Sequence, residues 1–292
     1  MPDHPPTVSL PLTLLHGWGM NAAVWDDWTR DGALDAEVRA IELPGHGERP
    51  FPPDCRDLAD WATDCLDQAP ERSIWVGWSL GGLIALAAAL QAPKRVAGLL
   101  LVTATPRFVR AVDWTPAMPP ETLDQFHAGL LADPAETLGR FLALQVRGSE
   151  TARETLRGLR RGIASRPAPD PAALSIGLDL LREDDLRGRL PDIHCPALWL
   201  FGTHDTLVPA AAAERIGCLM PGARTRIIQG AAHAPQLSHP REVRAAIDEL
   251  RTMIVDADAG DTTTPTPNVA WCSPLTRVSR ARPDQDRGQT DA

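Results

Sequence analysis

The chain has 292 residues, 43% hydrophobic and 23% charged, a balance that excludes wholesale disorder and allows a sizeable core. Its formal net charge of −9 argues against a nucleic acid or an anionic membrane surface as the main partner. No apolar run approaches the roughly 18 residues of a membrane span, and no secretion signal opens the chain, so we expect a cytoplasmic protein. Five scattered cysteines without a CxxC pair predict no disulfide framework, and eight histidines without HExxH spacing predict no metal site.

The first half of the chain shows short apolar runs that end in glycine turns. Residues 8–15 predict a strand that runs into the turn at residues 16–19, and residues 38–43 predict a second strand, closed by Pro44–Gly47. Residues 73–76 predict a third strand.

The third predicted strand is followed by a helix and another strand. Gly77 is expected to end the strand, and residues 80–90 are rich in Ala and Leu and predict a buried helix. Residues 96–102 are apolar throughout, which is typical of a strand covered on both faces. From about residue 105 to 188 only helical patterns appear.

Strand patterns return in the last part of the chain. Residues 197–201 and 225–228 predict two strands, and residues 243–254 predict a closing amphipathic helix. Strands that alternate with helices indicate a mostly parallel sheet with helices on both faces.

This organisation predicts a two-part core with an insertion. We expect residues 1–105 and 188–255 to form the α/β core, and residues 106–187 to form an inserted helical cap. Residues 256–292 contain few apolar side chains and are expected to be a disordered tail.

Gly77-Trp78-Ser79-Leu80-Gly81 fits the pattern G-x-S-x-G between a predicted strand and a predicted helix. The glycines allow a sharp turn that exposes the Ser79 hydroxyl in a strained conformation. The sequence therefore predicts Ser79 as a nucleophile.

A serine hydroxyl needs a base, and the base needs an orienting acid, in the chain order Ser, Asp or Glu, His. Asp205 follows the predicted strand 197–201, and His233 follows the strand 225–228. Active-site groups of parallel sheets gather past the carboxyl ends of the strands. We therefore predict Asp205 as the acid and His233 as the base.

Three rival residues fit these roles less well. Asp192 precedes its strand, His204 lies on the same loop as the predicted acid, and His239 is expected to begin the final helix.

Two backbone N–H groups are predicted to bind the oxyanion. Leu80 begins a helix, where an unpaired N–H and the helix dipole favour negative charge. The turn at residues 16–19 offers the N–H of Trp18 as the second donor. We expect His16 and His46 to hold turn structure rather than to act as bases.

These motifs resemble those of the α/β-hydrolase superfamily, and more closely those of the pimeloyl-[acyl-carrier protein] methyl ester esterases of biotin synthesis. The matching stretches are LLHGWGMNAAVW (14–25), LPGHG (43–47), WVGWSLGGL (75–83), RFLALQ (140–145), TAR (151–153) and AAHAPQLSHP (231–240).

The resemblance implies the α/β-hydrolase fold, the Ser79–Asp205–His233 triad and no cofactor. It also implies an enzyme that hydrolyses the methyl ester of a pimeloyl chain carried by acyl carrier protein. We expect this enzyme to be a monomer. The acyl chain would then pass along the cap residues Phe141, Leu142, Ala143, Leu144 and Gln145.

The charge distribution along the chain supports a carrier-protein partner. Residues 140–166 hold seven arginines against two acids, while the whole chain is acidic. Arg153 and Arg157 recur at helical spacing, and acyl carrier proteins are acidic, so these two residues and Arg140 are predicted to dock the carrier. A solvated helix with Glu150–Arg153 and Glu154–Arg157 pairs is the plainer interpretation.

Other functions remain open at the level of sequence. The same triad could serve a general short-chain carboxylesterase, a lactonase or a C–C bond hydrolase. A non-catalytic binding protein of the same fold is a remoter alternative.

Overall fold

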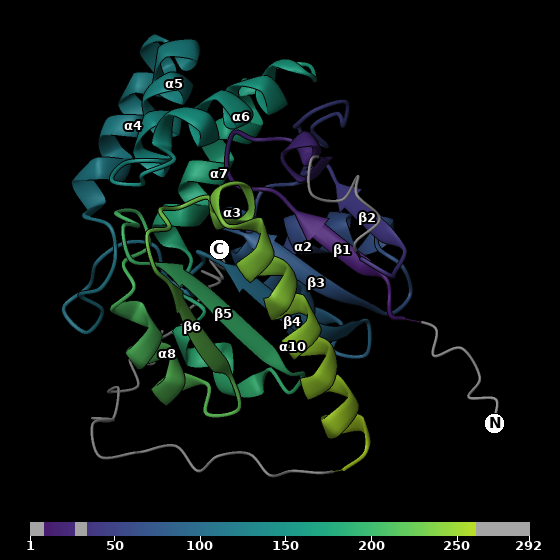
Figure 1. Ribbon diagram of the computed structural model, residues 1–292. Coiled ribbons are helices and arrows are strands. Elements are labelled where there is room, and N and C mark those ends of the chain that lie inside the picture. The colour runs from purple at the N-terminus through teal and green to yellow at the C-terminus, as the bar shows by residue number, and fades with distance from the viewer. Residues whose placement is uncertain (1–8, 27–33, 261–292) are drawn as a thin grey trace, which may run out of the picture.

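The computed structural model describes residues 9–26 and 34–260 (Figure 1). Six strands form one sheet in the order β2-β1-β3-β4-β5-β6, and every neighbouring pair is parallel. The strands are β1 (Leu12–Leu15), β2 (Val38–Ile41), β3 (Ser73–Trp78), β4 (Val96–Val102), β5 (Ala197–Gly202) and β6 (Arg224–Ile228). The helices are η1 (Ala22–Trp25), α2 (Leu58–Gln68), α3 (Leu80–Gln91), α4 (Pro120–Ala132), α5 (Pro134–Gln145), α6 (Ala152–Ala164), α7 (Pro171–Glu183), η2 (Arg187–Asp192), α8 (Ala212–Leu219), α9 (Pro235–Ser238) and α10 (Pro240–Asp258).

Helices cover both faces of the sheet, so its central strands are apolar on both sides. Leu99 and Leu101 of β4 pack in one cluster with α2 and α3. Leu100 and Val102 of the same strand pack on the opposite face with α10. This arrangement explains the unbroken apolar run of β4, which lies in the middle of the sheet.

Four helices, α4 to α7, lie in the chain between β4 and β5. Figure 1 shows them gathered at one end of the molecule, beyond the sheet. They are called the cap helices below. Loops at the carboxyl ends of the strands therefore lie between the sheet and these helices.

The predicted strands and helices are confirmed, with shifts at several boundaries. The first strand begins at Leu12, because Pro11 before it has no N–H for the sheet ladder. The second strand ends at Ile41 rather than at residue 43. The third strand continues through Gly77 to Trp78 instead of ending at the glycine. The closing helix is longer than predicted: it begins at Pro240 and ends at Asp258, inside the expected tail.

Helices α2 and α8 of the core were not predicted from the sequence. Helix α2 begins after Asp57, which forms a capping box with Asp60, and α8 begins at Ala212. Most of the expected tail, residues 261–292, lies outside the described residues. In the described ranges, no helix combines the length and apolar character needed to cross a bilayer.

Candidate active site

Ser79 lies on the turn between β3 and α3 in a backbone conformation that is rare for a side-chain-bearing residue. Its φ of 56° and ψ of −119° place it in the left-handed half of conformational space, and it is only 3% exposed. A Cβ at Gly77 would lie 2.5 Å from the carbonyl oxygen of Gly81, so this turn closes only with glycine there. The Ser79 N–H donates to the carbonyl of Val102 at 3.0 Å, which ties the turn to β4.

His233 lies on the loop after β6 and reaches Ser79. Its Nε2 lies 2.9 Å from the Ser79 Oγ, and its ring is buried. Cap helix α5 contributes to this position, because the His233 N–H donates to the carbonyl of Gln145 at 2.9 Å. The His233 carbonyl accepts hydrogen bonds from Trp78 Nε1 at 2.7 Å and Thr103 Oγ1 at 2.8 Å. The loop is therefore held by both the sheet and the cap.

Asp205 lies on the loop after β5 and binds the other nitrogen of the imidazole. Its Oδ2 lies 2.8 Å from His233 Nδ1. Its Oδ1 accepts the N–H groups of Leu207 at 2.8 Å and Val208 at 3.0 Å. With the carboxylate on Nδ1, that nitrogen carries the proton and Nε2 is free to accept the proton of Ser79.

The three rival residues lie in other surroundings. Asp192 forms an ion pair with Arg189 at 2.7 Å on η2, and His204 is exposed. His239 is the N-cap of α10, as predicted, and its Nδ1 lies 2.8 Å from the Ser238 hydroxyl. Among the described residues, none of the three has a hydrogen bond or an ion pair with Ser79.

The predicted oxyanion donors lie beside the serine. Leu80 is the first residue of α3, and a Cβ added at Gly17 would lie 3.3 Å from the Ser79 Cβ. In the described part of the chain, no hydrogen bond occupies the backbone N–H of Trp18 or of Leu80. Both N–H groups are therefore available to an anion formed next to Ser79.

The Trp18 side chain ties this loop to two cap helices. Its Nε1 donates to the carbonyl of Leu174 in α7 at 2.8 Å. Its ring meets Phe141 of α5 edge-on, with 4.8 Å between ring centroids, and Phe141 in turn meets Phe126 of α4 at 5.4 Å. A chain of aromatic rings thus runs from the outer cap to the loop beside Ser79.

The predicted acyl-contact segment divides between two faces of α5. Phe141, Leu142 and Gln145 are buried, and the Gln145 Oε1 has no hydrogen-bond partner among the described residues. Leu144 is half-buried and Ala143 is exposed. These last two residues line a pocket on the outer side of the cap.

That outer pocket has a volume of about 480 Å³ and lies between α4 and α5. Arg140 and Arg147 line it, and Phe126 forms part of its apolar wall. Arg140, Arg153 and Arg157 are all exposed, and no ion pair engages them among the described residues. Neither of the two expected Glu–Arg pairs on α6 is present there.

Trp78 and Thr103, which donate hydrogen bonds to the His233 carbonyl, were not predicted from the sequence. Thr103 follows β4 directly, so its place at a strand end was the signal that could have identified it. Its φ of 44° is a second sign of a constrained position that the sequence does not reveal. As for a metal, the described residues contain no group of three or more His, Cys, Asp or Glu side chains that could hold one.

Comparison with known proteins agrees with this geometry. The family model for the alpha/beta hydrolase fold matches residues 11–240. The pimeloyl-[acyl-carrier protein] methyl ester esterase of Edwardsiella ictaluri is 42% identical over 243 residues, which cover 82% of this chain and 92% of the relative. The chain belongs to this esterase family of α/β-hydrolases. The relative of the same name from Stenotrophomonas maltophilia is 42% identical over 250 residues, covering 85% of this chain and 95% of its own.

Solved structures support the fold. An esterase from Exiguobacterium antarcticum superimposes with a TM-score of 0.72 at 20% identity and covers 83% of this chain and 92% of its own. An esterase from Rhodococcus superimposes with a TM-score of 0.66 at 26% identity and covers 85% and 90%. The solved structures thus show the α/β-hydrolase fold, and the esterase relatives reported above show that the chain is an ester hydrolase.

Proposed function

We propose that this esterase hydrolyses the methyl ester of pimeloyl-[acyl-carrier protein] in biotin synthesis, releasing methanol and the free pimeloyl carboxylate. The observation that carries the proposal is the unbroken hydrogen-bond chain from Ser79 through His233 to Asp205, next to two free backbone N–H groups. The alignment with the relatives named for this reaction spans nearly the whole length of each relative. Because the carrier protein is a cytoplasmic partner, the same proposal places the enzyme in the cytoplasm.

In the first step, the Ser79 oxygen attacks the ester carbonyl while His233 Nε2 takes the hydroxyl proton. Asp205 holds the ring in this tautomer and stabilises the imidazolium. The carbonyl oxygen becomes an oxyanion and receives the N–H groups of Trp18 and Leu80. The tetrahedral species then collapses, and the leaving methoxide takes the proton from His233 and departs as methanol.

In the second step, water attacks the acyl-enzyme. His233 removes a proton from the water, the same N–H groups hold the second oxyanion, and the proton returns to Ser79 as the carboxylic acid leaves and ionises. The thioester that links the acyl chain to its carrier is untouched. All reacting groups come from one chain, so we take the monomer as the working unit, with residues 106–187 acting as its cap.

Mass spectrometry of methyl-pimeloyl carrier protein tests the proposal directly. Wild-type enzyme should remove 14 mass units, the methyl group replaced by a proton, and Ser79→Ala should lower the rate by several orders of magnitude. Ser238→Ala is a matched control, because that hydroxyl bonds the Ala234 carbonyl and His239 rather than the imidazole of His233. Demethylation that persists in Ser79→Ala would refute the proposal.

We further infer that the carrier docks on the arginines of the cap. Arg140, Arg153 and Arg157 are exposed and have no ion-pair partner among the described residues, and acyl carrier proteins are acidic. The pocket beside Arg140 lies at the outer end of the aromatic chain that leads to Trp18. The acyl chain would follow these rings, past Phe141, toward Ser79.

Charge reversal separates docking from catalysis. Arg153→Glu with Arg157→Glu should raise KM for the carrier-borne ester on the order of 10-fold and leave small free esters unaffected. Arg72→Glu is a control, since Arg72 lies at the amino end of β3, opposite the end that faces the cap, and pairs with Asp258 at 3.5 Å. Equal losses on both substrates would reject the docking surface.

A further inference from the structure

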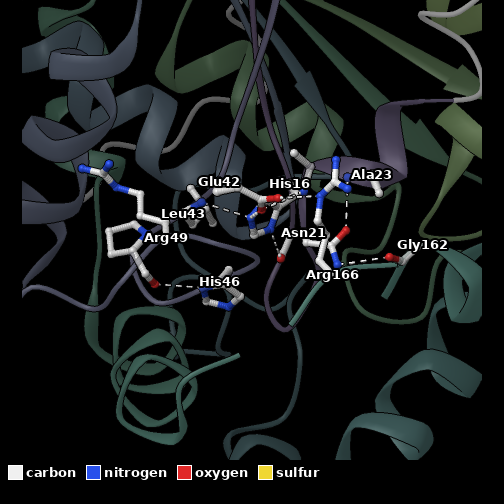
Figure 2. Close-up of polar contacts among 12 residues, drawn as sticks. His16, Asn21, Ala23, Glu42, Leu43, His46, Arg49, Gly162 and Arg166 are labelled. Atoms are coloured by element: carbon white, nitrogen blue, oxygen red, sulfur yellow. Dashed lines mark hydrogen bonds and ion pairs between the residues drawn. The ribbon is translucent and has the colours of Figure 1, made fainter. Parts of the chain in front are cut away.

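The loop that carries the Trp18 N–H is fastened at its far end by a polar cluster. Its residues run from His16, after β1, to the short helix η1. Glu42 occupies the corresponding place after β2, because Leu15 of β1 pairs with Ile41 of β2. The two parallel strands thus deliver His16 and Glu42 side by side at the carboxyl edge of the sheet, as Figure 2 shows.

Glu42 makes one short contact with the loop. Its Oε2 accepts the backbone N–H of Ala22, the first residue of η1, at 2.9 Å. The same oxygen lies 3.5 Å from the Nε2 of His16. A Cβ on Gly47 would collide with the Glu42 carboxylate, so the glycine turn after β2 leaves the space that this side chain needs.

His16 is the first residue of the loop, and its ring is held by hydrogen bonds to backbone groups. Its Nε2 accepts the Leu43 N–H at 3.1 Å, and its Nδ1 donates to the carbonyl of Gly17 at 2.9 Å. Both nitrogens of this fully buried ring are therefore used in structure, as expected from the sequence. The loop is held before Trp18 by His16 and after Trp18 by Glu42.

The same cluster reaches the end of cap helix α6. Asn21 Nδ2 donates to the carbonyls of Gly162 at 3.1 Å and Ile163 at 3.3 Å, while its Oδ1 accepts the Ala23 N–H at 3.1 Å. Arg166 Nε lies 3.7 Å from the Glu42 Oε1 (Figure 2). The loop and the cap are therefore joined by the side chains of Asn21 and Glu42.

The charge of Glu42 suits this position. Burial raises the pKa of the carboxyl group, but the His16 ring, the Ala22 N–H and the Arg166 guanidinium lower it more, so the pKa lies below its ordinary value. The group is therefore an acceptor with full negative charge near neutral pH. A charged acceptor makes a stronger hydrogen bond to a backbone N–H than a neutral one does.

We propose that Glu42 is a positioning residue for ester hydrolysis: by holding the Ala22 N–H it fixes the loop that presents the Trp18 N–H to the oxyanion. The inference rests on the proposed function in that it takes Trp18 as an oxyanion donor. Among the described residues, Glu42 has no hydrogen bond or ion pair with Ser79; its partners are Ala22, His16 and Arg166. It acts through the loop, and Arg166 and Asn21 extend the same connection to the helix that carries the docking arginines.

The test compares Glu42→Ala with Glu42→Gln on a small ester, p-nitrophenyl butyrate. Glu42→Ala removes the acceptor and should lower kcat on the order of 10-fold with little change in KM, because complete loss of an oxyanion donor costs roughly 100- to 1,000-fold. Glu42→Gln keeps an oxygen for the Ala22 N–H and should stay within about 3-fold of wild type. Glu48→Ala, an exposed acid on the adjacent turn, is the matched control.

Active-site titration separates positioning from folding. Each variant is titrated with a fluorophosphonate, and kcat is expressed per labelled serine, so an unfolded fraction does not count. We expect full labelling of Glu42→Ala at a rate reduced as kcat is. A kcat per labelled serine within 2-fold of wild type would overturn the proposal, and so would Gln and Ala variants that lose the same activity. Failure of wild-type Ser79 to react at all would instead refute the proposed function.

Discussion

The buried histidine of the turn after β2 should make the stability of the protein pH-dependent in a predictable way. His46 is fully buried, its Nδ1 donates to the carbonyl of Pro44 at 2.9 Å, and its Nε2 has no hydrogen-bond partner among the described residues. Burial, together with the neighbouring His16, lowers the pKa of His46 to about 3. The ring is therefore neutral in the folded protein near neutral pH.

The magnitude follows from proton linkage. In the unfolded chain His46 has a pKa of about 6.5, so between pH 3 and pH 6.5 the unfolded state binds the proton that the folded state rejects. Stability from this group is complete above pH 6.5 and is lost as the pH falls. Between pH 7 and pH 5 the loss amounts to about 2 kcal/mol of unfolding free energy.

His46→Phe isolates this effect, because it keeps an aromatic ring beside Trp61 and removes the titrating group. Urea denaturation at pH 7 and pH 5 should show that the variant loses about 2 kcal/mol less than wild type between the two conditions. Leu58→Val is the control: this buried, non-titrating change should cost the same at both pH values. If His46→Phe and wild type lose the same stability, His46 is protonated in the folded state and the reasoning fails.

Substitutions at three further positions test the site. Asp205→Asn should lower kcat by roughly 1,000- to 10,000-fold with KM nearly unchanged, because an amide next to Nδ1 favours the wrong tautomer of His233. A loss of less than 10-fold in steady-state kinetics would contradict the orienting role of Asp205. Gly177→Val should destabilise the protein by about 1–3 kcal/mol in thermal unfolding, because a Cβ at this position would lie 2.8 Å from the Trp18 ring. Unchanged stability would show that α7 is not tightly packed against the Trp18 ring. Thr103→Ala should lower kcat for small esters several-fold, because the His233 carbonyl loses a 2.8 Å hydrogen bond, and Thr103→Ser should restore kcat. Equal kcat values in wild type and both variants would show that this hydrogen bond does not position His233.

The sequence indicated the sheet because its four central strands are apolar on both faces and several strands end in glycine turns. The predicted positions of Ser79, Asp205 and His233 all follow strands, and the structure brings these residues into hydrogen-bond contact. Helix α2 escaped prediction because its apolar residues alternate with acids in a short stretch after a proline-rich turn. A sequence pattern predicts a helix or strand reliably only where one hydrophobic period dominates the segment.

The supporting contacts could not be predicted, because they join residues far apart in the chain. Asn21 bonds Gly162 and Ile163, and nothing local to either segment indicates the other. Glu42 reaches Ala22 only because β1 and β2 pair in one register. Such positions depend on how the sheet and the cap pack, and the backbone partners carry no side-chain signal.

The most direct test of the central claim is to measure kcat/KM for demethylation of methyl-pimeloyl carrier protein and of free monomethyl pimelate with the same enzyme preparation. Both reactions can be followed by mass spectrometry, with Ser79→Ala as the blank. We expect the carrier-borne ester to be hydrolysed much faster, and only with Ser79 present. Rapid hydrolysis of the free ester with no turnover on the carrier would contradict the proposed substrate and leave a general carboxylesterase.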